Sequence, residues 1–281
     1  MLRVVVVLAQ LSFRDLMRQR TLHLIFLFAF VILALTPLFI ELSFAEQLKF
    51  VKDFCFGAMV IFNVAMALLG ASHLLWGDME SRSLLTILAK PVDRWQVIVG
   101  KFLGLGLMLA LTIGFMTVMA FLISQWKKGM VIEEEKKLWG EGAAAIVEKI
   151  EQENRPELFF QAAVLVWCKA VIMAAITLFL TTVATSPIFS VLCGVLIYLI
   201  GHLQGVAREA LLTGEVSRAV EWLLWGLQRV MPDFSIFAPL EAISTQGSLS
   251  WGYVGQVVVY AVVLCCGALL LGIVAFQRRD F

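Results

Sequence analysis

Long runs of apolar residues, separated by shorter polar segments, dominate the chain. A helix needs about 20 apolar residues to cross the hydrocarbon core of a bilayer, and six runs approach or exceed that length. These runs are Leu22–Ile40, Phe54–Trp76, Phe102–Ile123, Leu158–Ala184, Ile188–Val206 and Tyr253–Phe276. Between the fourth and the fifth, Ser186-Pro187 predicts a tight turn, because proline cannot continue the preceding helix. The pattern predicts an all-α integral membrane protein with six transmembrane helices in a single domain, residues 1–281.

The composition argues against a soluble enzyme. Of the 281 residues, 61% are hydrophobic and 15% are charged, whereas about a quarter of the residues in a soluble domain are charged. The polar segments are too short to bury cores of their own, and no basic block suggests nucleic-acid binding. The five cysteines all lie in apolar runs without CxxC spacing, which indicates small buried hydrophobic residues. The three histidines lie at the ends of different spans, so we expect no metal site and no cofactor.

The distribution of charge predicts which segments face the cytoplasm. If both termini lie inside, ten Lys and Arg against five Asp and Glu give a net charge of +5 to the inner segments 1–21, 77–101, 185–187 and 276–281. Eleven Lys and Arg against sixteen Asp and Glu give −5 to the outer segments 41–53, 125–157 and 207–250. Basic residues concentrate in short cytoplasmic loops and span flanks. We therefore predict a multi-pass protein of the plasma (inner) membrane with cytoplasmic N- and C-termini.

Three segments outside the spans have patterns of their own. Basic residues on one face of 1–21, beside apolar positions, predict an interfacial helix at the inner leaflet. The outer loop 125–157 has the composition of a solvated helical hairpin, with docking of a partner as the alternative. Trp222 and Trp225 favour the headgroup level, so we expect re-entrant or interfacial helices within 207–250, which end at Pro232.

The segment 77–101, between the second and third spans, has the pattern of a rigid helix–turn–helix on the cytoplasmic face. Pro91 disfavours helical geometry at the residue before it and so ends the first helix. Asp93 occupies the N-cap position of the next helix with Gln96 three residues on, which is a capping-box arrangement. Three leucines form an apolar patch on the first helix: Leu84, Leu85 and Leu88.

Here the sequence resembles the permeases of type 2 ABC transporters, the ABC-2 class. The residues that carry the resemblance, in order, are Glu80, Leu84, Leu88, Lys90-Pro91, Arg94 and Gly100-Lys101. Four further stretches are similar to the family pattern: Phe13–Arg20, Ala45–Asp53, Met231–Phe237 and Phe276–Phe281. Together they cover most of the chain except the loop 125–157. The most similar subgroup is the one often labelled multicopper-enzyme maturation permease. Ser83 replaces the threonine usual in the family but keeps its hydroxyl group.

The resemblance implies a transport subunit driven by ATP. The chain would pair with a second copy or a homologous permease, and with two ABC ATPase subunits that bind the ATP. The chain contains no Gly-x-x-x-x-Gly-Lys-Ser/Thr loop to cradle a nucleotide of its own, so we expect it not to be an enzyme. Residues 80–94 would form the coupling helix. The residues implied in ATPase coupling are Glu80, Arg82, Leu84, Leu88, Lys90, Pro91, Arg94, Gly100 and Lys101.

Lys169 lies inside the fourth apolar run. An intramembrane lysine is a functional-site hypothesis by default, and the alternative is a side chain that snorkels to the outer headgroups. Two other classes of protein stay open on the residues alone. An integral-membrane enzyme needs convergent polar residues at one depth, and an ATP-independent secondary transporter usually shows internal repeats and broken spans. Neither pattern is evident, and the sequence does not identify a cargo.

Overall fold

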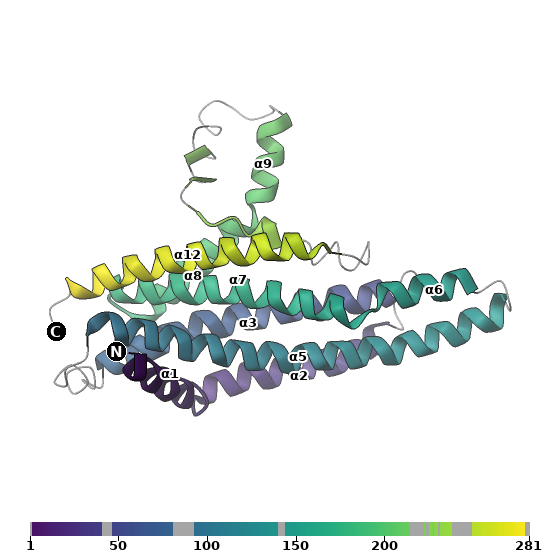
Figure 1. The fold of residues 1–281 in the computed structure, drawn as a ribbon, viewed down its shortest axis with the longest axis horizontal. Coiled ribbons are helices and arrows are strands. Elements are labelled where there is room, and N and C mark those ends of the chain that lie inside the picture. Colours follow the sequence, from purple (N-terminus) through teal and green to yellow (C-terminus); the bar gives the residue numbers. More distant parts are fainter. Residues whose placement is uncertain are drawn as a thin grey trace.

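The computed structural model describes residues 2–40, 47–80, 93–139, 144–213, 222, 225–226, 228–229, 231–237 and 249–278, and the regular structure in them is helical. Within this part of the chain, five long helices run along the molecule (Figure 1). They are α2 (Arg20–Ile40), α3 (Gln47–Glu80), α5 (Arg94–Trp139), α7 (Pro156–Val183) and α12 (Trp251–Gln277). The prediction of an all-α membrane protein is confirmed.

Helix α7 forms the centre of the bundle and packs against α3, α5 and α12. Its buried residues lie on every side of the helix, which is the pattern expected of a helix surrounded by others. Phe159 of α7 contacts Phe56 of α3 and Phe121 of α5, with ring centroids 5.6 and 5.3 Å apart. Aromatic pairs of this kind contribute about 0.5–1.5 kcal/mol beyond the burial of their area.

Four of the described helices are long and apolar enough to cross a bilayer: α3, α5, α7 and α12. The bent pair of α1 (Leu2–Leu16) and α2 adds a fifth candidate if it is counted as one span. The apolar helix α8 (Pro187–His202) has 16 residues and rises about 24 Å, which is shorter than the hydrocarbon core of about 30 Å. Length and composition thus give four to five spans, so the predicted number of six is not confirmed.

Helices α1 and α2 meet at an angle of 67°. The buried side of α1 faces α5 and has the spacing of a single helix face; it consists of Val5, Ala9, Ser12 and Leu16. Val6, Val7 and Leu11 on other sides of α1 are exposed. A helix with apolar residues both against the bundle and outside it suits the membrane boundary, where the sequence predicts an interfacial helix.

Helix α5 continues past the bundle to Trp139, and the short helix α6 (Ala144–Glu153) packs beside its end (Figure 1). Asn154 fixes the base of this hairpin. Its side-chain oxygen accepts from the Ser124 hydroxyl at 2.7 Å, and its amide nitrogen donates to the Ser124 carbonyl at 3.3 Å. Helices therefore occupy most of 125–157, and the side of the membrane on which they lie stays a prediction.

The turn at Ser186-Pro187 separates α7 from α8. Ser186 is the N-cap of α8, and its hydroxyl oxygen accepts from the Phe189 amide at 3.3 Å. Helix α8 ends at His202, whereas the sequence predicts a span that continues to Val206. The next helix, α9 (Gln204–Thr213), leaves the bundle and projects away from it (Figure 1).

The chain termini lie at the same end of the bundle (Figure 1). The C-terminal end of α3 lies there too, because Asp78 of α3 pairs with Lys101 near the start of α5. The start of α8 lies beside α3, since Ser72 donates a hydrogen bond to the Pro187 carbonyl. Arg94 at the start of α5 contacts the end of α12. The segments that the charge pattern assigns to one side of the membrane therefore share one end of the molecule, hereafter the terminal end.

Candidate functional site

The predicted coupling segment connects α3 to α5 at the terminal end. Five of its nine implied residues lie outside the described part of the chain: Arg82, Leu84, Leu88, Lys90 and Pro91. The other four flank the segment. Glu80 is the exposed last residue of α3, and Arg94 is the first residue of α5, with Gly100 and Lys101 two turns further on.

Lys101 joins the start of α5 to the end of α3. Its side chain is 4% exposed, and its ammonium group pairs with the Asp78 carboxylate and donates to the Leu74 carbonyl. Because removing one partner would leave the other charge buried, breaking such a pair costs about 3–5 kcal/mol. The Gly-Lys pair of the motif therefore includes an internal structural contact.

Arg94 joins the start of α5 to the end of α12. One guanidinium nitrogen donates to the carbonyls of Phe276, at 3.0 Å, and Gln277, at 3.1 Å. The last carbonyls of a helix lack partners within the helix and carry its negative dipole end, so a cation there is favourable. Asp93 and Gln96 are in contact at the start of the helix: the Gln96 side-chain amide donates to the Asp93 carboxylate at 3.3 Å, and the Gln96 backbone amide donates to the Asp93 carbonyl at 3.0 Å. These are not the hydrogen bonds of the predicted capping box.

Gly100 and Gly104 let α1 pack closely on α5. A Cβ atom at Gly100 would lie 2.6 Å from Leu8 Cβ, and one at Gly104 would lie 2.6 Å from the Ala9 carbonyl oxygen. Real Cβ atoms do not approach other atoms so closely, so any larger residue would move α1. Small residues four apart allow this kind of contact between membrane helices.

These contacts make the start of α5 a junction of four helices. Asp78 belongs to α3, Gly100 and Gly104 receive α1, and the Arg94 contact reaches α12. We call Asp78, Arg94, Gly100, Lys101 and Gly104 the anchor cluster. A rigid displacement of the α3–α5 connection would be passed through this cluster to three neighbouring helices at once.

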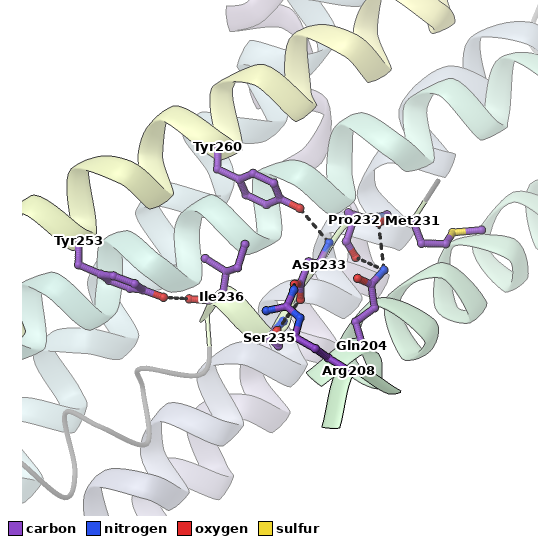
Figure 2. Close-up of polar contacts among 9 residues, drawn as sticks. All are labelled: Gln204, Arg208, Met231, Pro232, Asp233, Ser235, Ile236, Tyr253 and Tyr260. Atoms are coloured by element: carbon purple, nitrogen blue, oxygen red, sulfur yellow. Dashed lines mark hydrogen bonds and ion pairs between the residues drawn. The ribbon is translucent and has the colours of Figure 1, made fainter. Parts of the chain in front are cut away.

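A second polar region lies where Met231–Phe237 packs against α8, α9 and α12 (Figure 2). Side chains of α12 form hydrogen bonds with backbone groups of this segment. The Tyr260 hydroxyl accepts from the Asp233 amide at 2.8 Å, and the Tyr253 hydroxyl donates to the Ile236 carbonyl at 2.6 Å. Irregular backbone at membrane depth is tolerated only where it is buried in protein and satisfied in this way.

Gln204 explains why α8 ends early. Its side-chain amide donates to the carbonyls of Met231, at 3.0 Å, and Pro232, at 3.4 Å. Asp233 completes the region, since its carboxylate accepts from Arg208 at 2.7 Å and from the Ser235 hydroxyl at 2.5 Å (Figure 2). The chain therefore turns where polar groups from 231–235 provide partners.

Lys169 lies next to this region, in the middle of α7. It is 13 residues from Pro156 and 14 from Val183, or about 20 Å from either end of the helix. The side chain is 4% exposed, and its ammonium group lies 5.1 Å from the Tyr198 ring and 5.8 Å from the Phe234 ring. Among the described residues the ammonium makes no hydrogen bond or ion pair. Whether Lys169 binds a ligand or snorkels to the headgroups stays a prediction.

Gly104, Asp233 and Tyr260 are not among the site residues predicted from the sequence. Gly104 had a usable signal, because Gly100-x-x-x-Gly104 is a small-x-x-x-small pattern inside an apolar run. Asp233 lies in the stretch Met231–Phe237 that is similar to the family pattern, but nothing in the local pattern places this aspartate beside a tyrosine 27 residues away. No group of three or more His, Cys, Asp or Glu that could hold a metal ion occurs among the described residues.

Several long apolar helices, joined by a junction of four helices at one end, are those of a multi-pass membrane protein. The family model for ABC-2 family transporter proteins matches residues 6–281 of the chain. The chain therefore belongs to the ABC-2 transporter family and is a transport subunit of the membrane. Members of this family generally work with an ABC ATPase partner. A comparison with curated proteins found no match.

Proposed function

We propose that the chain is the transmembrane subunit of an ABC transporter that couples ATP hydrolysis by a separate subunit to the export of a cargo. The observation that carries this proposal is the anchor cluster. A segment that only links two helices needs no buried ion pair, no arginine at a neighbouring helix end and no glycine-lined contact with a fourth helix. A segment that receives force from a partner does need them, because force enters at one point and must move several helices.

In this mechanism residues 80–94 form the coupling helix and dock on the ATPase. Leu84 and Leu88 supply the apolar contact, since an apolar patch outside the membrane marks a protein partner. Closure of the ATPases on ATP then displaces the start of α5. Lys101 carries α3 with it, Arg94 carries α12, and the glycine contacts carry α1.

The Arg94 contact refines the role that the resemblance implies for this residue. Its guanidinium group donates to the carbonyls at the end of α12, so we assign Arg94 to transmission between helices in addition to any contact with a partner carboxylate. Glu80, which is exposed at the end of α3, has the position to face that partner directly.

At mid-depth we assign Lys169 to cargo binding. A buried cation without a counter-ion among the described residues is the complement of an anionic group. Tyr198 and Phe234 keep the ammonium group in place through cation–π contacts while no anion is bound. We further propose a dimer of this chain or of homologous permeases with two ATPase subunits, in the plasma (inner) membrane with both termini in the cytoplasm.

The experiment that tests the coupling assignment is replacement of Leu88 by aspartate. Loss of one buried interface anchor typically costs about 2 kcal/mol or more, and an unpaired charge in the interface adds to that. We expect Leu88→Asp to abolish co-purification of the ATPase while the amount of permease in the membrane stays at the wild-type level. Leu88→Met is the matched control, because it keeps the apolar volume, and it should retain the ATPase. Wild-type stoichiometry with Leu88→Asp would contradict the assignment.

A further inference from the structure

Two aromatic rings from different parts of the chain lie against the ammonium group of Lys169. Tyr198 belongs to α8, whereas Phe234 belongs to the segment 231–237, which follows no long helix. The ammonium group lies 5.1 Å from the Tyr198 ring and 5.8 Å from the Phe234 ring, and Lys169 is 4% exposed. Phe234 is itself fully buried. Part of the cover over the lysine is therefore carried by a segment outside the long helices.

A glycine near the end of α8 provides the space for Phe234. A Cβ atom at Gly201 would lie 2.5 Å from Phe234 Cδ2 and 2.6 Å from the Pro232 carbonyl oxygen. The Phe234 amide donates to the Gly201 carbonyl at 3.0 Å. Real Cβ atoms do not approach other atoms so closely, so only a residue without a Cβ lets the segment come this near. The Phe234 ring therefore packs directly on the backbone of α8.

Side chains of α9 and α12 fasten the segment on both sides of Phe234 (Figure 2). Before it, the Asp233 amide donates to the Tyr260 hydroxyl at 2.8 Å, and the Asp233 carboxylate pairs with Arg208 of α9 at 2.7 Å. After it, the Ile236 carbonyl accepts from the Tyr253 hydroxyl at 2.6 Å. The position of the Phe234 ring is thus set by three side chains that are not part of the segment.

Helix α12, which carries both tyrosines, also reaches the anchor cluster. The carbonyls of Phe276 and Gln277 at its other end accept from Arg94 of α5. Tyr260 and Phe276 are 16 residues apart on this one unbroken helix, which corresponds to about 24 Å. A rigid element of this kind can carry a displacement from one end to the other. The cover over Lys169 is therefore held by a helix that the start of α5 also contacts.

We propose that residues 231–237 form a strap that closes over Lys169, and that α12 holds this strap closed through the hydroxyl groups of Tyr253 and Tyr260. In the closed strap the Phe234 ring occupies a place beside the ammonium group that an anionic group would take. When α12 moves away from the strap, the two hydrogen bonds break, the ring leaves and the ammonium group becomes accessible. This inference rests on the proposed function, since it assigns control of access to the lysine that we assign to cargo binding.

The test measures chemical access to Lys169 in the purified full-length chain, with the lysine itself unchanged. A water-soluble acylating reagent, a sulfonated N-hydroxysuccinimide ester, is added to the chain in detergent, and peptide mass spectrometry follows the acylation of each lysine with time. Lys136, which is exposed on α5, reports the activity of the reagent. Lys101, which is as buried as Lys169, reports unfolding of the chain. In the wild type we expect Lys136 to react rapidly and the two buried lysines slowly.

Two variants loosen the strap to different extents. Tyr260→Phe removes one hydroxyl group and keeps the ring. We expect it to raise the acylation rate of Lys169 about two- to tenfold, since a neutral hydrogen bond contributes about 0.5–1.5 kcal/mol and tenfold corresponds to about 1.4 kcal/mol. Phe234→Ala removes the cover itself and should raise the rate further. Thr117→Val is the matched control: it removes a hydroxyl that donates to the Ile113 carbonyl within α5, and it should leave the rate unchanged.

Each part of the proposal has its own contradicting result. An unchanged Lys169 rate in Phe234→Ala overturns the cover, and an unchanged rate in Tyr260→Phe overturns the role of α12. If Tyr260→Phe also makes Lys101 reactive, the variant has unfolded, and Arg208→Met decides instead. This second variant removes the ion pair with Asp233 from an exposed position, so the same rise in the Lys169 rate is expected, and an unchanged rate overturns the strap.

The acylation measurement does not depend on the cargo. A strap that opens in these variants while Lys169→Met transports normally would contradict the assignment of Lys169 to cargo binding and would leave the strap in place. The two failures are therefore distinguishable.

Discussion

Lys169 lies about 20 Å from both ends of α7. Placing a lysine at the centre of a membrane helix costs about 2.5–3.5 kcal/mol. Desolvated cation–π contacts, such as those with Tyr198 and Phe234, offset about 2 kcal/mol of this. On these magnitudes, a charged ammonium group at this position would lower the stability of the bundle by about 1 kcal/mol.

Replacement of Lys169 by an uncharged residue tests this expected loss of stability. Lys169→Met should raise the thermal unfolding midpoint of the purified permease by about 2–4 °C, because methionine fills the site without a charge, and the same substitution should impair transport. Lys136→Met, on the exposed end of α5, should change neither. A Lys169→Met variant that transports normally would contradict the assignment of Lys169 to cargo binding.

Some of this site could be predicted from the sequence, because a lysine inside an apolar run stands out. Its partners could not, since Tyr198 and Phe234 lie 29 and 65 residues further along the chain. The cysteines show the same limit. Cys55, Cys168 and Cys265 are buried as the apolar pattern predicts, but Cys266 is exposed, because the run in which it lies does not reveal which face of α12 meets α7.

At the scale of helices, close contact through Gly100 and Gly104 joins α1 to α5. Gly104 receives α1 within 2.6 Å of the Ala9 carbonyl oxygen and 2.7 Å of Ser12 Cβ. The Ala9 oxygen belongs to the backbone of α1, and Ser12 Cβ is attached directly to it. No change of rotamer in α1 could therefore make room for a side chain at position 104. The helix as a whole would have to shift.

We predict that Gly104→Ala lowers the stability of the permease by about 1–3 kcal/mol, the range for overpacking. A Cβ atom at Gly106, two residues further along α5, would meet nothing within 4 Å. Gly106→Ala should therefore raise stability by about 0.5–1 kcal/mol through helix propensity. Thermal unfolding of the two purified variants measures the difference. Equal effects of the two substitutions would show that α1 does not depend on the glycine contact.

The long helices could be predicted because an apolar run of about 20 residues has few alternatives in a membrane protein. The turn at Ser186-Pro187 could be predicted for a local reason, the N-cap and the proline. The residue at which α8 ends could not be predicted from the sequence. Gln204 finds its partners at Met231 and Pro232, and a hydrogen bond across 27 residues leaves no trace in the local pattern.

For the whole molecule, the charge split predicts that the terminal end faces the cytoplasm. We expect an impermeant thiol reagent added from outside to label Gly140→Cys but not Leu85→Cys, each in a variant without the five native cysteines. Permeabilised cells, in which both positions should react, provide the control. Labelling of position 85 but not 140 from outside would reverse the orientation.

The family could be recognised before the structure was known, because its motifs occur in order along the chain. The contacts that those motifs make in the structure could not be predicted. Gly100 receives Leu8, 92 residues earlier, and Arg94 meets Phe276, 182 residues later. Such contacts depend on how the helices pack, which an apolar pattern alone does not fix.

The central proposal is that the chain is a permease that depends on a separate ATPase. The most direct measurement is affinity purification of the tagged full-length chain from its native membranes, followed by identification of bound proteins and an ATPase assay. The account predicts an ABC ATPase at one copy per permease, with hydrolysis that disappears when the ATPase is removed, because the chain has no phosphate-binding loop of its own. Hydrolysis by the permease alone, or a functional permease that retains no ATPase, would contradict it.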